Sequence, residues 1–211
     1  MRHFLLTSLL FSALVATGCA DSGSSLFVIG VAGLTDDCVV EPGNLVLSGA
    51  VDVTATDSLT IFPVFASQLR DRVSASAANP SDMHVRWVDV RLLDLGGNPL
   101  ALGLPNPFRV PTSVFIMGFS GTGNPNTAAG AVQVLPPGYP AAVAAASGGP
   151  VLAELRPIGI TNGGIHVEGN YDFQYQLQVC SGCLTRCAIG DETEVVPCTP
   201  GENEITIIAC P

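Results

Sequence analysis

The residues of this chain with the clearest capacity for chemistry are the cysteines near its C-terminal end. Cys180, Cys183 and Cys187 form a CxxCxxxC pattern, and Cys198 and Cys210 follow. Thiolates in such a cluster could bind zinc, but structural zinc sites take paired CxxC knuckles or nearby histidines. The cluster has a single knuckle and no histidine. We therefore expect no metal ligands and no cofactor.

A thiol-redox role is a second interpretation of the same cluster. Cys180-Ser181-Gly182-Cys183 has the spacing of a thioredoxin-like motif and follows an expected strand. That chemistry depends on a helix N-terminus, which lowers the pKa of the attacking thiol. The neighbouring sequence favours strands instead. Structural disulfides are the favoured interpretation, with redox or zinc chemistry at Cys180, Cys183 and Cys187 as the alternative.

Residues 1–19 carry an export pattern. Arg2 precedes an apolar run over residues 4–16, which is too short to span a membrane comfortably. The segment from Ala16 to Cys19 reads ATGC and resembles a bacterial lipobox, with alanine where that pattern usually has leucine. We expect residues 1–18 to be removed as a lipoprotein signal peptide and Cys19 to be lipidated. Ordinary signal cleavage, with Cys19 left as an unmodified thiol, is the alternative.

The cysteines that remain once Cys19 is set aside are disulfide candidates. Of the 7 cysteines in the chain, 6 are left, an even number that predicts three disulfides in an exported protein. Spacing does not define their connectivity. Cys38 lies far from the others, so a bridge from it must join the start of the domain to its end. The candidates are Cys38, Cys180, Cys183, Cys187, Cys198 and Cys210.

Support for nucleophilic catalysis is thin. Residues 118–122 read GFSGT, which lacks the final glycine of a GxSxG elbow. His84 and His166 both fall on the polar phases of expected strands. A triad of Ser120 with either histidine would make an envelope hydrolase, but nothing in the spacing favours one. We expect no catalytic residues and a protein that is not an enzyme.

A strand that covers a core is expected over residues 165–179. Alternate residues from Ile165 to Val179 are apolar or aromatic apart from Gly169, and the intervening residues are polar. A single strand of this length would extend about 50 Å, beyond the usual range. We therefore expect a bend or bulge at Gly169-Asn170.

Aromatic residues on this strand and on one other could line a ligand surface. Aromatic side chains on one phase of a strand are more often part of a core, and we expect that outcome here. Arg86 and Arg91 flank the tryptophan and are expected to point to water. The four aromatic residues are Trp87, Tyr171, Phe173 and Tyr175.

Further strands are expected from runs rich in valine, isoleucine and threonine. A slip in alternation at Trp87-Val88 predicts a bulge, and Pro63 indicates an edge strand or a bend. Pro157 is expected to interrupt the strand over residues 151–161. Asn162-Gly163 favours a tight hairpin turn, and Pro140 the start of a short helix. Residues 120–130 are expected to form a loop. The other strand segments are 26–32, 44–56, 59–66, 83–95, 113–119 and 151–161, and 194–196 with 204–209 as a final hairpin.

These segments amount to roughly eight to ten strands and one short helix, without helix–strand alternation, which favours an all-β fold. We predict an antiparallel β-sandwich, Ig-like in the broad sense, with a disulfide-stapled C-terminal region. Residues 19–25 are expected to form a polar tether and residues 26–211 a single domain.

The charge of the chain argues against one class of partner. It has 18 acidic and 8 basic residues, for a net charge of −10. Proteins that bind nucleic acid need a basic stripe, which this sequence lacks. We expect no nucleic-acid partner.

The whole pattern resembles the uncharacterised cysteine-rich lipoproteins of myxobacteria. The matching features are the lipobox ending at Cys19, Asp36-Asp37-Cys38, Pro136-Pro137, and residues 179–184 with Cys187. The resemblance implies export and a β-rich fold, and it implies no activity. We therefore expect a lipid-anchored protein of the bacterial cell envelope, in the outer membrane, with a non-enzymatic structural or binding role. The sequence does not identify an envelope protein or polysaccharide partner.

Overall fold

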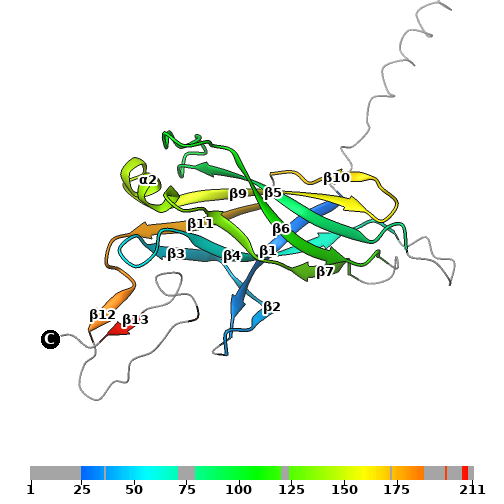
Figure 1. The fold of residues 1–211 in the computed structure, drawn as a ribbon, viewed down its shortest axis with the longest axis horizontal. Helices are drawn as coiled ribbons and strands as arrows, with labels where there is room; N and C mark the ends of the chain where they lie inside the picture. Colours follow the sequence, from blue (N-terminus) through cyan, green and yellow to red (C-terminus); the bar gives the residue numbers. More distant parts are fainter. Residues whose placement is uncertain are drawn as a thin grey trace, which may run out of the picture.

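The structure is a computed structural model, and it describes residues 25–35, 37–70, 79–119, 124–171, 173–187, 198 and 206–208. These residues form thirteen strands and one short helix (Figure 1), which confirms the expected all-β fold. The strands are β1 (Leu26–Leu34), β2 (Val40–Val46), β3 (Ser48–Asp52), β4 (Leu59–Ser67), β5 (Met83–Leu93), β6 (Phe108–Ile116), β7 (Asn126–Ala129), β8 (Val132–Leu135), β9 (Val151–Thr161), β10 (His166–Glu168), β11 (Phe173–Cys180), β12 (Thr185–Cys187) and β13 (Thr206–Ile208), and the helix is α2 (Tyr139–Ala146).

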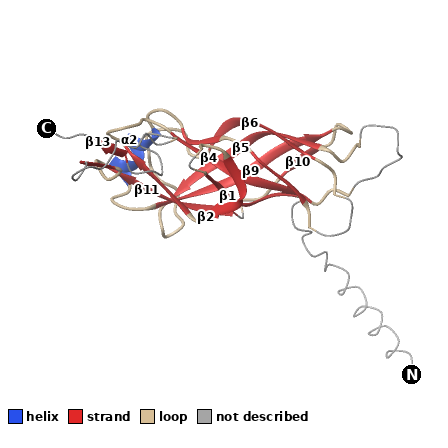
Figure 2. Ribbon diagram, turned by 90° about the horizontal axis from the view of Figure 1, so that it is seen from below, coloured by secondary structure: helices blue, strands red, loops and turns tan. Residues whose placement is uncertain are grey.

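Two sheets make the sandwich. Sheet A has the order β2-β1-β4-β7, and β8 also pairs with β4. Sheet B has the order β3-β11-β9-β5-β6, and β10 also pairs with β9. The pairs are antiparallel except for β3 beside β11, which is parallel. The sandwich is elongated, with α2 and β13 at one end and β10 towards the other (Figure 2).

Inward-facing residues of both sheets form one hydrophobic core. β5 shows how the sequence produces it. Val85 and Val88 are both fully buried although three positions separate them, because the pairing of β5 with β6 and β9 shifts register between Val85 and Trp87. The predicted bulge near Trp87 is thus confirmed, and it keeps the apolar face of the strand on the core.

Residues 44–56 do not form one strand, contrary to the prediction. They divide at Leu47, which is 90% exposed, into the end of β2 in sheet A and β3 in sheet B. The chain therefore crosses from one sheet to the other at this point. Both β2 and β3 are edge strands on the same side of the sandwich.

The long alternating segment is interrupted where a bend was expected. β10 and β11 both pair with β9, and the chain between them leaves the ladder at Gly169-Asn170. The Gly169 N–H donates to the Pro157 carbonyl at 2.8 Å. A Cβ at Gly169 would lie 2.7 Å from the Leu26 carbonyl oxygen, so this close approach requires glycine. β9 continues through Pro157 without interruption.

Pro63 lies within sheet A rather than on its edge. β4 pairs with β1 on one side and with β7 and β8 on the other. The β8 pairing ends at Ile61 and the β7 pairing begins at Val64, so Pro63 occupies the gap where an N–H is not needed. β7 also corrects the prediction of a loop over residues 120–130.

The remaining local predictions have mixed outcomes. Pro140 lies in the first turn of α2, and the turn at Asn162-Gly163 joins β9 to β10, as expected. β13 pairs in parallel with β12. Residues 194–196, the other strand of the expected final hairpin, lie outside the described residues. Within the described part of the chain, no helix has the length and apolar character needed to cross a membrane.

Candidate functional site

The structure closes two of the predicted disulfides. Cys38 bonds Cys198 with a Cα–Cα distance of 5.3 Å, so the start of the domain is tied to its end. Cys180 bonds Cys183 with a Cα–Cα distance of 5.9 Å. Cys187 lies in β12, whereas Cys19 and Cys210 lie outside the described residues. A third disulfide therefore stays a prediction.

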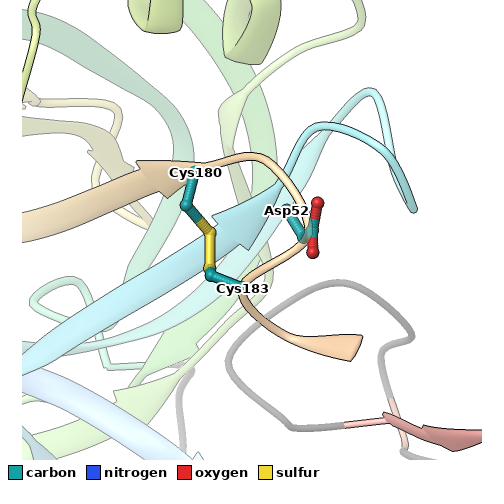
Figure 3. Close-up of side chains that lie close together, drawn as sticks. All are labelled: Asp52, Cys180 and Cys183. Atoms are coloured by element: carbon teal, nitrogen blue, oxygen red, sulfur yellow. A yellow bond between two sulfur atoms is a disulfide. The ribbon is translucent and has the colours of Figure 1, made fainter. Parts of the chain in front are cut away.

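The Cys180–Cys183 turn closes over a carboxylate that the sequence analysis did not single out. Asp52 ends β3 directly opposite Cys180 in the parallel ladder. The chain leaves β11 at Cys180, passes beside Asp52 and continues through Cys183 (Figure 3). Asp52 is fully buried. An aspartate within a valine-rich run was the available sequence signal, but the run gives no hint of the partner strand.

Four hydrogen bonds satisfy the Asp52 carboxylate. Its Oδ1 accepts from the N–H and hydroxyl of Thr54 at 3.0 and 2.6 Å. The same oxygen accepts from the Gly182 N–H at 2.8 Å, and Oδ2 accepts from the Leu184 N–H at 3.1 Å. The turn that carries the disulfide is thus attached to β3 through its own backbone.

These bonds decide the charge state of Asp52. Burial alone would raise the pKa of this carboxyl, because the charged form loses its hydration. The hydrogen bonds from Thr54, Gly182 and Leu184 favour the charged form and together outweigh burial, lowering the pKa from 3.8 to about 2. Asp52 is therefore ionised at neutral pH.

The same corner brings together three groups that could ligate a metal ion. The ligand atoms of Asp52, Cys180 and Cys183 all lie within 4.8 Å of one another. Asp52 already accepts four hydrogen bonds, and the two sulfur atoms are bonded to each other. Metal binding would require reduction of the disulfide. If it were reduced, the anionic Asp52 would also oppose formation of a thiolate beside it.

A second group of polar residues covers the outer face of sheet B. Asp89 on β5 accepts two hydrogen bonds from Arg109 on β6, at 2.6 and 3.1 Å. It accepts a third from Arg156 on β9 at 2.6 Å. The bond from Arg109 is the largest cause that lowers the pKa of Asp89, and Arg156 adds to it against the effect of burial. Three adjacent strands are linked through one carboxylate.

This ionic group extends along the sheet towards β11. Glu154 on β9 pairs with Arg91 and accepts a hydrogen bond from Gln174 at 2.8 Å. The Tyr171 ring lies under two guanidinium groups, 4.5 Å from that of Arg91 and 5.1 Å from that of Arg156. The prediction of a core position for Tyr171 was therefore wrong. Arg91, expected to point to water, is 37% exposed and also pairs with Glu154. The sequence indicated the strands but not which charged residues face each other across them.

The other aromatic and histidine candidates are divided between core and surface. Tyr175 is buried in the core as expected and Phe173 packs partly against it, but Trp87 is 42% exposed because the bulge turns it outward. His84 and His166 are both exposed, as expected. Each lies opposite Ile160 of β9, His84 on β5 and His166 on β10. Ser120 lies outside the described residues.

Comparison of the chain with protein-family models, with curated proteins and with solved structures gives no match.

Proposed function

We propose that this protein is exported to the bacterial cell envelope, anchored in the outer membrane through lipid on Cys19, and serves a non-enzymatic structural or binding role. The observation that carries the proposal is the Cys38–Cys198 disulfide, which spans a sequence separation of 160 residues. Disulfides of this kind persist in oxidising compartments and are rare in the cytosol. The bond therefore supports export, and the lipobox-like segment before Cys19 supports the anchor.

The arrangement of the charged residues supports a role without catalysis. Hydrogen bonds keep Asp52 ionised, and through them its carboxylate fixes the position of the turn that follows β11. Asp89 and Glu154 are each engaged with arginines on neighbouring strands. Groups arranged in this way stabilise a scaffold, whereas a general base needs a pKa near the working pH.

The test is an intact-mass measurement on protein from a native membrane fraction, denatured without reductant and treated with a thiol alkylator. The expected mass is that of a lipidated chain beginning at Cys19 with no alkylated cysteine. A mass without lipid would overturn the anchor. Replacing the lipidated residue, Cys19→Ser, should move the protein out of the membrane fraction, and Ser25→Ala provides a matched control that should stay in it.

A thiol-redox or zinc-binding role at Cys180, Cys183 and Cys187 is the second candidate. It is favoured by the close approach of Asp52, Cys180 and Cys183. The disulfide would have to accept two electrons and two protons to become a dithiol, so part of the mature protein should carry free thiols. Two or more alkylated cysteines in the same mass measurement, followed by metal analysis, would favour this candidate over the first.

A further inference from the structure

A cavity of about 510 Å³ lies between the two sheets, at the side where the chain crosses from β2 to β3. Residues of β1, β2 and β4 line it from sheet A, and residues of β3 and β11 line it from sheet B. Its volume falls within the range of about 300–1,000 Å³ that is usual for small-molecule sites. The core that fills the rest of the sandwich is therefore incomplete at this edge.

The chemistry of the walls selects an uncharged ligand. Val46, Ile61 and Phe62 supply apolar surface, and Asn44 and Gln176 supply neutral polar groups. None of the described residues that line the cavity is acidic, basic or a histidine. An ion that moved into this space would lose its hydration without meeting an opposite charge, which is costly.

Tyr175 lines the cavity and carries a polar group without a partner among the described residues. Its side chain is only 1% exposed, and its hydroxyl has no hydrogen-bond partner in the described part of the chain. The other largely buried tyrosine, Tyr139, donates to the Pro105 carbonyl at 2.8 Å. Most buried polar groups in proteins are bonded, so one that is not needs an explanation. Burial raises the pKa of Tyr175 to about 12, so the hydroxyl keeps its proton at neutral pH.

Leu47 lies beside the cavity where the chain crosses between the sheets. It is 90% exposed and stands between the lining residues Val46 and Ser48. Together with the apolar lining residues Ile61 and Phe62, it favours a ligand with an apolar body.

We propose that this cavity binds an uncharged small molecule with an apolar body and an oxygen atom that accepts a hydrogen bond from the Tyr175 hydroxyl. The chemical class is that of neutral ketones, esters and ethers. The inference rests on the binding part of the proposed function and is independent of the lipid anchor. The mass measurement tests the anchor, and a binding titration tests the cavity, so each can fail without the other.

The test uses prodan, an uncharged naphthalene ketone whose emission shifts to the blue when its carbonyl leaves water. The purified protein should bind it saturably with a blue shift. Ser48→Phe places a ring at the cavity and should weaken binding at least about tenfold. Ser113→Phe, the same change at an exposed position of edge strand β6, should leave the affinity unchanged. Circular dichroism shows whether each variant is folded.

Tyr175→Phe examines the hydroxyl without changing the shape of the side chain. The loss of one net hydrogen bond should weaken prodan binding by about three- to tenfold. The variant should also unfold at a higher urea concentration, because a buried hydroxyl without a partner is removed. Unchanged affinity, or a lower urea midpoint, would show that the hydroxyl has another partner and would overturn the proposal. So would the absence of saturable binding, or binding that Ser48→Phe does not weaken.

Discussion

Asp52 and Asp89 are both buried carboxylates of sheet B, and the protein satisfies them in opposite ways. Asp52 accepts from neutral donors, two of them backbone N–H groups of the turn at residues 180–184. Asp89 accepts from two guanidinium groups, of Arg109 and Arg156, whose side chains are 51% and 31% exposed. Backbone donors fix the path of the chain, whereas partly exposed ion pairs join side chains and are weakened by water and salt. The first arrangement should therefore hold the fold more strongly than the second.

The largest effect is expected for Asp52→Asn. The asparagine side chain has one acceptor oxygen in place of two, and its NH2 group faces a backbone N–H that is itself a donor. At least one N–H of the turn therefore loses its acceptor. The free energy of unfolding should fall by about 2–3 kcal/mol. Urea unfolding measures it, with Asp57→Asn, an exposed aspartate that follows the same strand, as a control that should stay within about 0.5 kcal/mol. A loss at Asp52 no larger than that of the control would contradict the comparison.

Acid should remove the same interaction. The pKa of Asp52 is lowered from 3.8 to about 2 in the folded protein, so the folded state favours the ionised carboxylate. This contribution is complete above the unfolded pKa and is lost as the pH falls towards 2. The difference in unfolding free energy between the parent and Asp52→Asn should accordingly shrink between pH 5 and pH 2. A difference that stays constant over this range would show that folding does not change the pKa of Asp52, and would contradict the interaction.

The sequence predicted the sandwich but not this corner of it. Alternation over residues 173–180 is a local property, so it identified β11 and its apolar face. The pairing of Asp52 with Cys180 joins strands far apart in the chain, and a parallel neighbour leaves no local mark. The predictions for Trp87 and Tyr171 were wrong for a related reason. The side each ring faces depends on a bulge and on which arginines lie across the sheet, and neither can be read from alternation.

Asp89→Asn should have a smaller effect that depends on salt. Its partners are partly exposed and can turn to water, so the expected loss is about 1–2 kcal/mol at low ionic strength. Because screening shortens the reach of charges from about 10 Å at 0.1 M to 3 Å at 1 M, the loss should decrease in high salt. The loss for Asp52→Asn should change little over the same series. Glu168→Gln, at a 59% exposed carboxylate paired with Arg156, is the matched control and should cost less than about 0.5 kcal/mol.

The smallest effect is expected for the double change Cys180→Ser and Cys183→Ser. The disulfide closes a loop with a sequence separation of only 3, so it restricts the unfolded chain little. We expect a loss of about 1 kcal/mol, at the low end for disulfides.

The informative measurement is the double-mutant cycle with Asp52→Asn. If Asp52 holds the turn through the N–H groups of Gly182 and Leu184, then Asp52→Asn should cost about as much without the disulfide as with it. A cost that disappears in the serine background would mean that the disulfide positions the turn and that the carboxylate only follows. If the disulfide contributes little to the free energy of unfolding, the fold survives its loss, and the bond can be reduced and reformed. That outcome would strengthen the redox candidate at Cys180 and Cys183, whereas a large contribution would leave the bond as a structural staple.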